Sequence, residues 1–159
     1  MAAVTADQVP TVRSIQNATE DTRPIKTSVT VYVGALVNFT TIGRLTDAAA
    51  AASVTFAGEL IEIINESGTI VAAGTGNSAG TVKGRFRYGH EMLLNVKTST
   101  RTYSNYGKSV LIADNVTVAG TSVGTAGLRV VAGTLTEFGS TTATGWVRLR
   151  TMGTAAAST

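Results

Sequence analysis

Short runs in which apolar and polar residues alternate recur along most of this 159-residue chain. In the clearest run, Lys83, Arg85 and Arg87 alternate with small or apolar residues. Successive side chains of a strand point to opposite faces, so this run predicts a strand with one basic and one apolar face. Residues 59–66 predict a second strand, buried on one face and partly covered on the other.

Turn residues separate these runs about every 8–12 residues, a spacing typical of β-sandwiches and barrels. Asp47 precedes the alanines at 48–52. Since Asp caps helices and Ala favours them, one or two helical turns are predicted there, although such a short helix needs packing to persist. We therefore expect an all-β fold: a compact sandwich-like or barrel-like body with at most one short helix.

Three segments are expected along the chain. Residues 1–28 lack a steady period and contain Pro10 and Pro24, which predicts an extended N-terminal arm. Residues 29–150 form the β-rich body, and residues 151–159 form a tail of mostly small residues. The arm is either a free terminus or a segment that becomes ordered on a partner subunit. In the second case its apolar anchors would be Val9, Val12, Ile15 and Ile25. Its contact residues would be Val12, Arg13, Ile15, Arg23 and Ile25.

The amino-acid composition excludes several kinds of functional site. The chain has no cysteine, which excludes disulfides, thiolate metal sites and cysteine nucleophiles. Only 14% of the residues are charged, and Thr, Val and Gly are abundant, which indicates a β-rich body whose faces are covered by neighbours. No long apolar run and no basic-then-apolar start is present, so we expect neither a membrane span nor a secretory signal.

Two glycine-containing motifs resemble nucleotide-binding loops but fail on inspection. Gly107, Lys108 and Ser109 match the end of a phosphate-binding loop, but Thr102 replaces its first glycine and a strand-like run follows. Gly107 is therefore expected to bend the chain into a strand. The glycine-rich run at 74–80 departs from the dinucleotide-binding spacing and precedes a basic strand, so it is interpreted as a hairpin loop.

No pattern marks a catalytic or metal site. His90 is the only histidine, and the His-Glu pair it begins lacks the second histidine of a zinc motif. We expect a turn histidine. Any two of several glutamates can meet in space as a glycosidase pair, but nothing singles out a pair among Glu59, Glu62, Glu91 and Glu137. We expect no enzyme activity, cofactor or metal.

The segment 83–108 holds six basic residues and one acidic residue, a net charge of +5, whereas the whole chain carries +3. Aromatic residues among basic ones are typical of single-stranded nucleic-acid platforms, but alternation places Phe86 and Tyr88 opposite the basic side chains. The other interpretations are a positive face toward an acidic protein surface, and a face that only promotes solubility. The candidate contact residues here are Lys83, Arg85 and Arg87.

A similar alternation near the C-terminus places Trp146, Arg148 and Arg150 on one face. Arginine can stack on tryptophan across such a face, and both residues are enriched at interface cores. A buried core tryptophan is the alternative interpretation.

Several runs resemble the small capsid decoration (cement) proteins of tailed bacteriophages. They are YGKSVLIADNVTV at 106–118, GLRVVAGTLTEF at 127–138, GWVRLR at 145–150 and VGALVNFTTIGRLTDAAAAA at 33–52. In that family a glycine precedes an apolar strand that ends in an acidic turn, and a strand of the form V-x-G ending in an acid follows. The resemblance covers about residues 29–150.

This resemblance implies a compact β-body without catalysis, cofactor or metal, made in the bacterial host cytoplasm. Such proteins are usually homotrimers that sit on the outer surface of the expanded phage head. There they bind and cross-link major capsid protein subunits, with no direct nucleic-acid or membrane contact. The alternatives are a tail-tube or head-fibre component, a carbohydrate- or nucleic-acid-binding β-module, and a glycan-cleaving enzyme.

Overall fold

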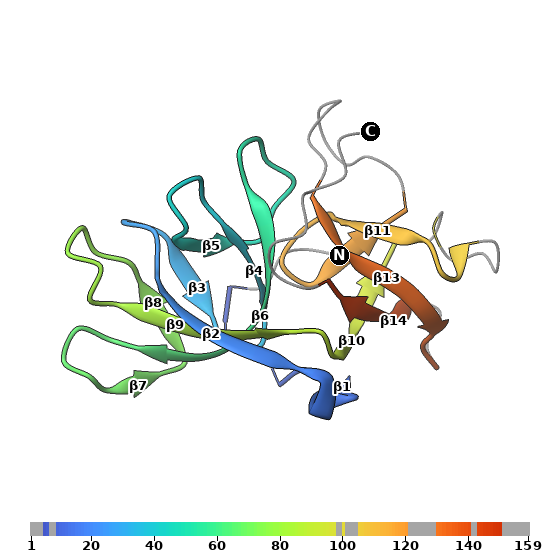
Figure 1. The fold of residues 1–159 in the computed structure, drawn as a ribbon, viewed down its shortest axis with the longest axis horizontal. Coiled ribbons are helices and arrows are strands. Elements are labelled where there is room, and N and C mark those ends of the chain that lie inside the picture. Colours follow the sequence, from blue (N-terminus) through green and yellow to red (C-terminus); the bar gives the residue numbers. More distant parts are fainter. Residues whose placement is uncertain are drawn as a thin grey trace.

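In the computed structural model the chain is built almost entirely from β-strands, which form two lobes side by side (Figure 1). The structure describes residues 5–6, 9–97, 100, 105–120, 130–140 and 143–150. Helical conformation in these residues is limited to short 3-10 segments: η1 (Ile15–Asn17) is described in full, and Thr100 and Asn105 are also in 3-10 conformation. The prediction of an all-β, barrel-like body with at most one short helix is confirmed.

The first lobe is an antiparallel five-stranded sheet in the order β2-β9-β6-β4-β5 (Figure 1). The two ends of this sheet meet, because Ile25, directly after β2, forms a parallel bridge with Leu45 of β5. β7 pairs with β6, and β3 pairs with β8 in a separate two-stranded sheet. The strands are β2 (Thr19–Pro24), β3 (Thr30–Tyr32), β4 (Leu36–Phe39), β5 (Leu45–Asp47), β6 (Thr55–Ile64), β7 (Ile70–Val71), β8 (Ala73–Thr75) and β9 (Lys83–Tyr88).

The second lobe is a closed five-stranded barrel in the order β10-β12-β11-β13-β14, closed by the pairing of β14 with β10. The β10–β12 pairing is parallel, and the other pairings of this barrel are antiparallel. β1 also pairs with β10. The strands are β1 (Val12–Arg13), β10 (Glu91–Val96), β11 (Ser109–Ile112), β12 (Thr117–Ala119), β13 (Val131–Phe138) and β14 (Thr144–Leu149).

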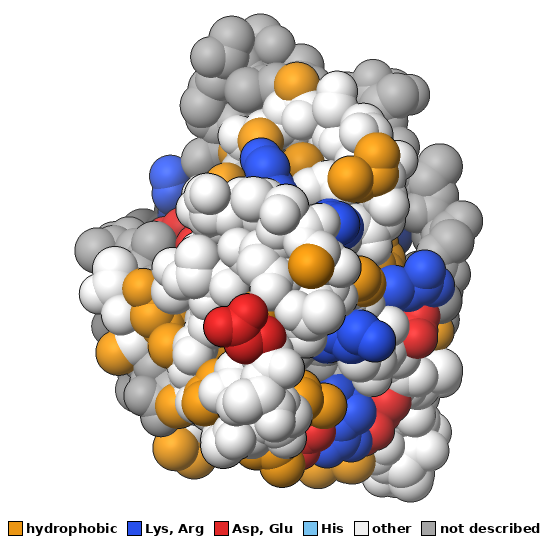
Figure 2. Space-filling model, turned by 90° about the vertical axis from the view of Figure 1, so that its left-hand side faces the viewer, with side chains coloured by type: hydrophobic (Ala, Val, Ile, Leu, Met, Phe, Trp, Pro, Cys, Tyr) orange, Lys and Arg blue, Asp and Glu red, His pale blue; other side chains and the backbone are white. Residues whose placement is uncertain are grey.

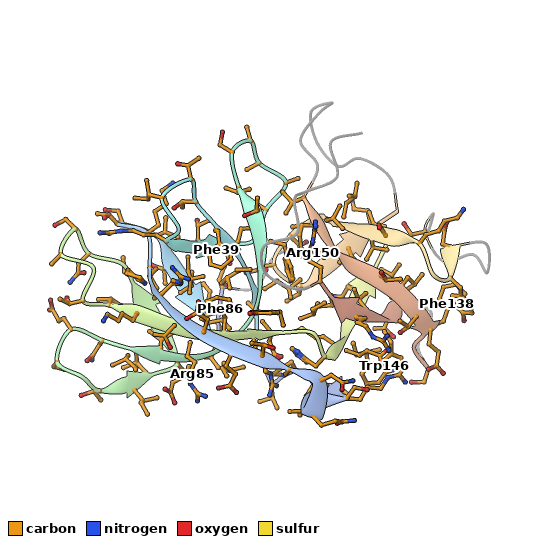
Figure 3. All side chains as sticks on the ribbon, viewed as in Figure 1. Phe39, Arg85, Phe86, Phe138, Trp146 and Arg150 are labelled. Carbon is orange, nitrogen blue, oxygen red and sulfur yellow. The ribbon has the colours of Figure 1, made fainter. Side chains whose placement is uncertain are left out.

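Each lobe has its own apolar core. The core of the first lobe surrounds Phe86, whose ring meets Phe39 edge-on with the ring centroids 5.3 Å apart (Figure 3). The core of the second lobe fills the barrel, and it also includes Leu36, Ala48 and Phe56 from the first lobe. Because both lobes contribute to this second core, separating them would expose buried apolar surface to water.

The predicted alternation in β9 is confirmed. Gly84, Phe86 and Tyr88 are buried, and the basic residues between them point outward. Gly84 lacks a side chain where Leu60 and Leu45 approach, so the core closes over it. The hydrophobic pattern alone therefore fixed which face of this strand turns inward.

Residues 59–64 of the strand predicted at 59–66 lie in β6, but a β-bulge interrupts the strict alternation of its two faces. Its pairing with β9 shifts register between Leu60 and Glu62. As a result Leu60 and Ile63 both face the core although they are three residues apart. Glu59 and Glu62 likewise both lie opposite arginines of β9. A bulge places one extra residue in a strand and so reverses the alternation after it.

The predicted helical turns after Asp47 are also wrong, because residues 48–54 form a loop. The side chain of Asp47 accepts a hydrogen bond from Asn115 of the second lobe, at 2.8 Å. Ala48 is buried in the core of that lobe, and the Asn38 side chain donates to the Ala49 carbonyl at 3.1 Å. These tertiary contacts override the helix propensity of the alanines.

Residues 12–24 of the predicted arm are extended apart from the η1 turn, and they pair with both lobes. β1 pairs with β10 of the barrel, and β2 pairs along its whole length with β9. This N-terminal strap, as we call residues 12–24, therefore crosses the junction between the lobes (Figure 1). The predicted tail at 151–159 lies outside the described residues.

Gly58 of β6 generates a stability prediction. A Cβ built there would lie 2.2 Å from the Arg87 carbonyl oxygen, and the φ of Gly58 is +156°. We expect Gly58→Ala to lower the free energy of unfolding by about 3 kcal/mol, since the sheet must shift to admit the methyl group. Urea denaturation followed by circular dichroism measures this change.

Gly43→Ala is the matched control. Gly43 also has a positive φ, +77°, but no atom lies within 4 Å of the point that a Cβ would occupy there. Only the conformational cost of about 1 kcal/mol should remain at this position. Equal losses of stability in the two variants would contradict the close approach of β6 and β9.

Candidate functional site

The outward, basic face of β9 is covered by carboxylates from both neighbouring strands. Arg85 forms ion pairs with Glu20 of β2 and, at 3.3 Å, with Glu62 of β6. Arg87 donates two hydrogen bonds to Glu59 of β6, at 2.9 and 3.0 Å. The two arginines therefore face three glutamates, and their positive charge is neutralised within the chain. Figure 3 shows Arg85 on the outer side of the first lobe.

A buried cluster of Glu59, Arg87 and His90 lies where the two lobes join. Glu59 is 1% exposed and His90 is fully buried in the bend between β9 and β10. His90 Nε2 donates to Glu59 Oε2 at 2.7 Å, since an ionised carboxylate can only accept. Burial opposes ionisation of Glu59, but hydrogen bonds from His90 and Arg87 outweigh it and lower the pKa of Glu59.

This cluster corrects the expectation of an ordinary turn histidine. His90 does lie in a bend, but its ring is enclosed and paired with a carboxylate. Among the described residues, His90 Nδ1 has no hydrogen-bond partner. A catalytic triad would need a nucleophile, such as a serine hydroxyl, hydrogen-bonded to this nitrogen. The described residues place no such group there. The contacts that are present hold β6, β9 and the β9–β10 bend in one arrangement.

A second charged cluster fastens the N-terminal strap to the barrel. Arg13 of β1 forms ion pairs with Glu91 at 3.0 Å and with Glu137 at 2.9 Å. Its guanidinium also lies over the Trp146 ring, 4.1 Å from the centroid, in a cation–π arrangement. The pKa of Glu91 is lowered because hydrogen bonds from Arg13 and Thr136 outweigh the opposing effect of burial. The arginine that stacks on Trp146 thus comes from the N-terminal strap and not from β14.

A third polar contact joins the lobes directly. Asn115 lies in the turn between β11 and β12 and is fully buried. Its side-chain amide donates a hydrogen bond to the Asp47 carboxylate, and its backbone carbonyl accepts one from the Leu36 backbone amide at 2.8 Å. Burial, with repulsion from Asp114, raises the pKa of Asp47 to about 6. Ionising Asp47 therefore costs more free energy in the folded protein than in the unfolded chain, although the carboxyl is still mostly ionised at pH 7.

The structure separates the predicted contact residues into different environments. Ile25 is fully buried in the core of the first lobe, so its predicted role as a partner contact is wrong. Val12 packs partly buried against the second core, and Arg13 is held as described above. Ile15 remains 48% exposed. Arg23 is exposed but pairs with Asp21 at 2.9 Å.

The predicted basic contact face, Lys83, Arg85 and Arg87, is only partly a free surface. Lys83 is exposed at the start of β9. Arg85 and Arg87 are engaged by glutamates of the same chain, so a positive face at these two residues is not offered to a partner. The net charge of the segment 83–108 does not include the acidic residues that strand pairing brings beside it from β2 and β6.

The strands on either side of the two glycine-containing motifs show what each motif does in the fold. Gly107, with a φ of +77°, leads into β11, which confirms the predicted bend into a strand. The run at 74–80 spans the end of β8 and the loop before β9, as its glycines suggested. It is not a hairpin, because β8 pairs with β3 while β9 pairs with β2 and β6.

Three apolar side chains are largely exposed to solvent. Val9, one of the expected anchors of the arm, is 98% exposed, whereas Ile42 (78%) and Ile70 (65%) had no expected role. Ile42 lies at the tip of the β4–β5 hairpin, beside a hollow of about 310 Å³. The available signal was an isoleucine inside the turn sequence Thr-Thr-Ile-Gly, where a polar residue is the usual choice.

Comparison with protein-family models, curated proteins and solved structures finds no match to this chain. In the described part of the chain, no helix has the length and apolar character needed to cross a membrane. The described residues also contain no group of three or more His, Cys, Asp or Glu side chains arranged to hold a metal ion.

The Glu59 cluster predicts unequal effects of two arginine substitutions. Arg87→Met should lower the free energy of unfolding at pH 7 by about 3–5 kcal/mol, because it leaves a buried carboxylate short of a partner. Arg85→Met should cost only about 1 kcal/mol or less, since its pairs are partly exposed. Urea denaturation at pH 7 compares them, and similar losses in both variants would contradict a special role for the buried pair.

Asp47 predicts a pH dependence of the opposite sign from that of a paired surface acid. Because its pKa in the folded protein is raised to about 6, its ionisation costs stability as the pH rises from about 4 through 6. Asp47→Asn should increase the free energy of unfolding at pH 7.5 and leave it nearly unchanged at pH 4. Denaturation curves across this range test the prediction, and a variant less stable at pH 7.5 would contradict it.

Proposed function

We propose that this protein is a structural component of a bacteriophage particle: a decoration protein that binds the outer surface of the capsid as a homotrimer. It cross-links major capsid protein subunits and catalyses no reaction. The observation that carries the proposal is where the phage-like runs lie. Residues 106–118 and 145–150 form β11, the acidic turn, β12 and β14, which are framework strands of the closed barrel.

The remaining phage-like runs support the same proposal. The described part of residues 127–138 contains β13 of the barrel, and residues 33–52 contain β4 and β5. Leu36 and Ala48 from the second of these runs pack into the barrel core. The runs that suggested the family thus contribute to one continuous packed unit rather than to scattered loops.

The construction of the lobes suits a protein that resists mechanical load. The lobes share a core, the N-terminal strap pairs with both, and buried ion pairs fix their junction. A rigid body that binds only the assembled, expanded capsid stabilises that state by its binding free energy. A trimer engages several capsid subunits at once, so modest single contacts combine by avidity.

The nucleic-acid alternative receives less support from the geometry. Its candidate phosphate contacts were Arg85 and Arg87, and glutamates of β2 and β6 already engage both side chains. The aromatic residues Phe86 and Tyr88 lie in the core of the first lobe, where bases cannot stack on them.

The test is binding to capsids that lack the protein. Purified protein should sediment as a trimer and should pellet with expanded empty capsids of the phage that encodes it, but not with unexpanded ones. Saturating binding should also raise the temperature at which the capsids disrupt in a thermal scan. A protein that stays in the supernatant at saturating capsid concentration would refute the proposal, and bound protein located by electron microscopy on a tail would replace it with a tail function.

A further inference from the structure

A hollow of about 310 Å³ lies between two loops of the first lobe. One loop is the tip of the β4–β5 hairpin, with Thr41 and Ile42, and the other joins β5 to β6, with Ala52 and Val54. Both loops project from the same edge of the lobe (Figure 1). Ile42 is 78% exposed at the rim, so an apolar side chain here remains in contact with water.

One basic residue, Lys26, lines this hollow and has no carboxylate partner among the described residues. The Lys26 amide donates to the Leu45 carbonyl at 2.7 Å, which places Lys26 next to the start of β5. Arg44, at the base of the β4–β5 hairpin, does not line the hollow: its guanidinium donates to Thr27 Oγ1 and to the backbone carbonyls of Asn77 and Ser78 in the loop before β9. Among the described residues, neither Lys26 nor Arg44 forms an ion pair, in contrast to Arg85 and Arg87.

The space-filling view shows how the types of side chain are distributed over one face of the molecule. On the face in Figure 2, apolar side chains lie next to basic ones toward the top of the described surface. Lower on this face, acidic and basic side chains lie together. Apolar side chains also lie at the lower left and along the lower edge of this view, so the apolar surface is not confined to the top.

We propose that this hollow receives a polypeptide segment of the capsid subunit in which an apolar side chain lies next to a carboxylate. The apolar side chain fills the space beside Ile42 and Val54, and the carboxylate pairs with Lys26. A hollow of this size accommodates one anchoring side chain, the usual form of an interface hot spot. The inference rests on the proposed function and names the chemistry of the partner surface.

A second copy of this chain fits the hollow poorly, because most of its described carboxylates are already engaged. Arginines hold Glu20, Asp21, Glu59, Glu62, Glu91 and Glu137. Asp47 bonds Asn115 across the lobe junction, and Asp114 accepts from the Val116 amide. Complementary negative charge must therefore come mainly from a different polypeptide.

Two substitutions and two matched controls test the inference. Ile42→Ser removes the apolar rim and Lys26→Glu reverses the charge, and both positions lie outside the buried cores. Each should weaken binding to expanded empty capsids about tenfold in a co-sedimentation titration, because an anchoring contact is lost. Ile70→Ser removes a comparably exposed isoleucine from β7, and Lys108→Glu reverses an exposed charge before β11. Both controls should bind like the wild type.

The outcomes separate this inference from the function on which it rests. Wild-type protein that fails to bind capsids overturns the proposed function and, with it, this inference. Wild-type binding that Ile42→Ser and Lys26→Glu leave unchanged, or that the controls weaken equally, overturns the inference alone. Variants that lose trimer formation in sedimentation velocity but keep their capsid affinity per subunit would assign the hollow to a second copy, which also overturns it.

Discussion

The buried carboxylate of Glu59 is the constraint around which the first lobe and the lobe junction are arranged. An ionised group that is 1% exposed is tolerated only when strong hydrogen bonds replace its water. Arg87 supplies two of these bonds from β9, and His90 supplies a third from the bend that leads into the barrel. Satisfying one side chain thus fixes the register of two strands and the direction in which the chain enters the second lobe.

The other connections between the lobes are of different physical kinds and act together. Leu36, Ala48 and Phe56 extend the barrel core into the first lobe, while Asn115 makes polar contacts with both the backbone and a side chain of that lobe. The strap adds backbone pairing to both lobes, and Arg13 holds its beginning on the barrel. Apolar burial, hydrogen bonding and ion pairing therefore all oppose movement of one lobe against the other.

Patterns read from sequence succeeded where they depend on neighbouring residues alone. The alternation in β9 gave the correct faces, and Gly107 was correctly expected to lead into a strand. They failed where the local structure depends on residues that are distant in the sequence. The spacing of apolar residues does not reveal the bulge after Leu60, and contacts with the other lobe keep the alanines after Asp47 from forming a helix. Glutamates of β2 and β6 neutralise the charges of Arg85 and Arg87. The Glu59–His90 pair has no sequence signature, because the two residues meet only through the fold.

The strand order has a consequence for how the chain acquires its structure. β10 pairs with β1, β12 and β14, so the barrel cannot close before β14 has left the ribosome, and β2 must wait for β9 before it finds its partner. Until then Leu36, Ala48 and Phe56 have no barrel to pack against. Such non-local pairing slows folding and leaves apolar surface temporarily uncovered, which makes the unfinished chain a natural client for chaperones.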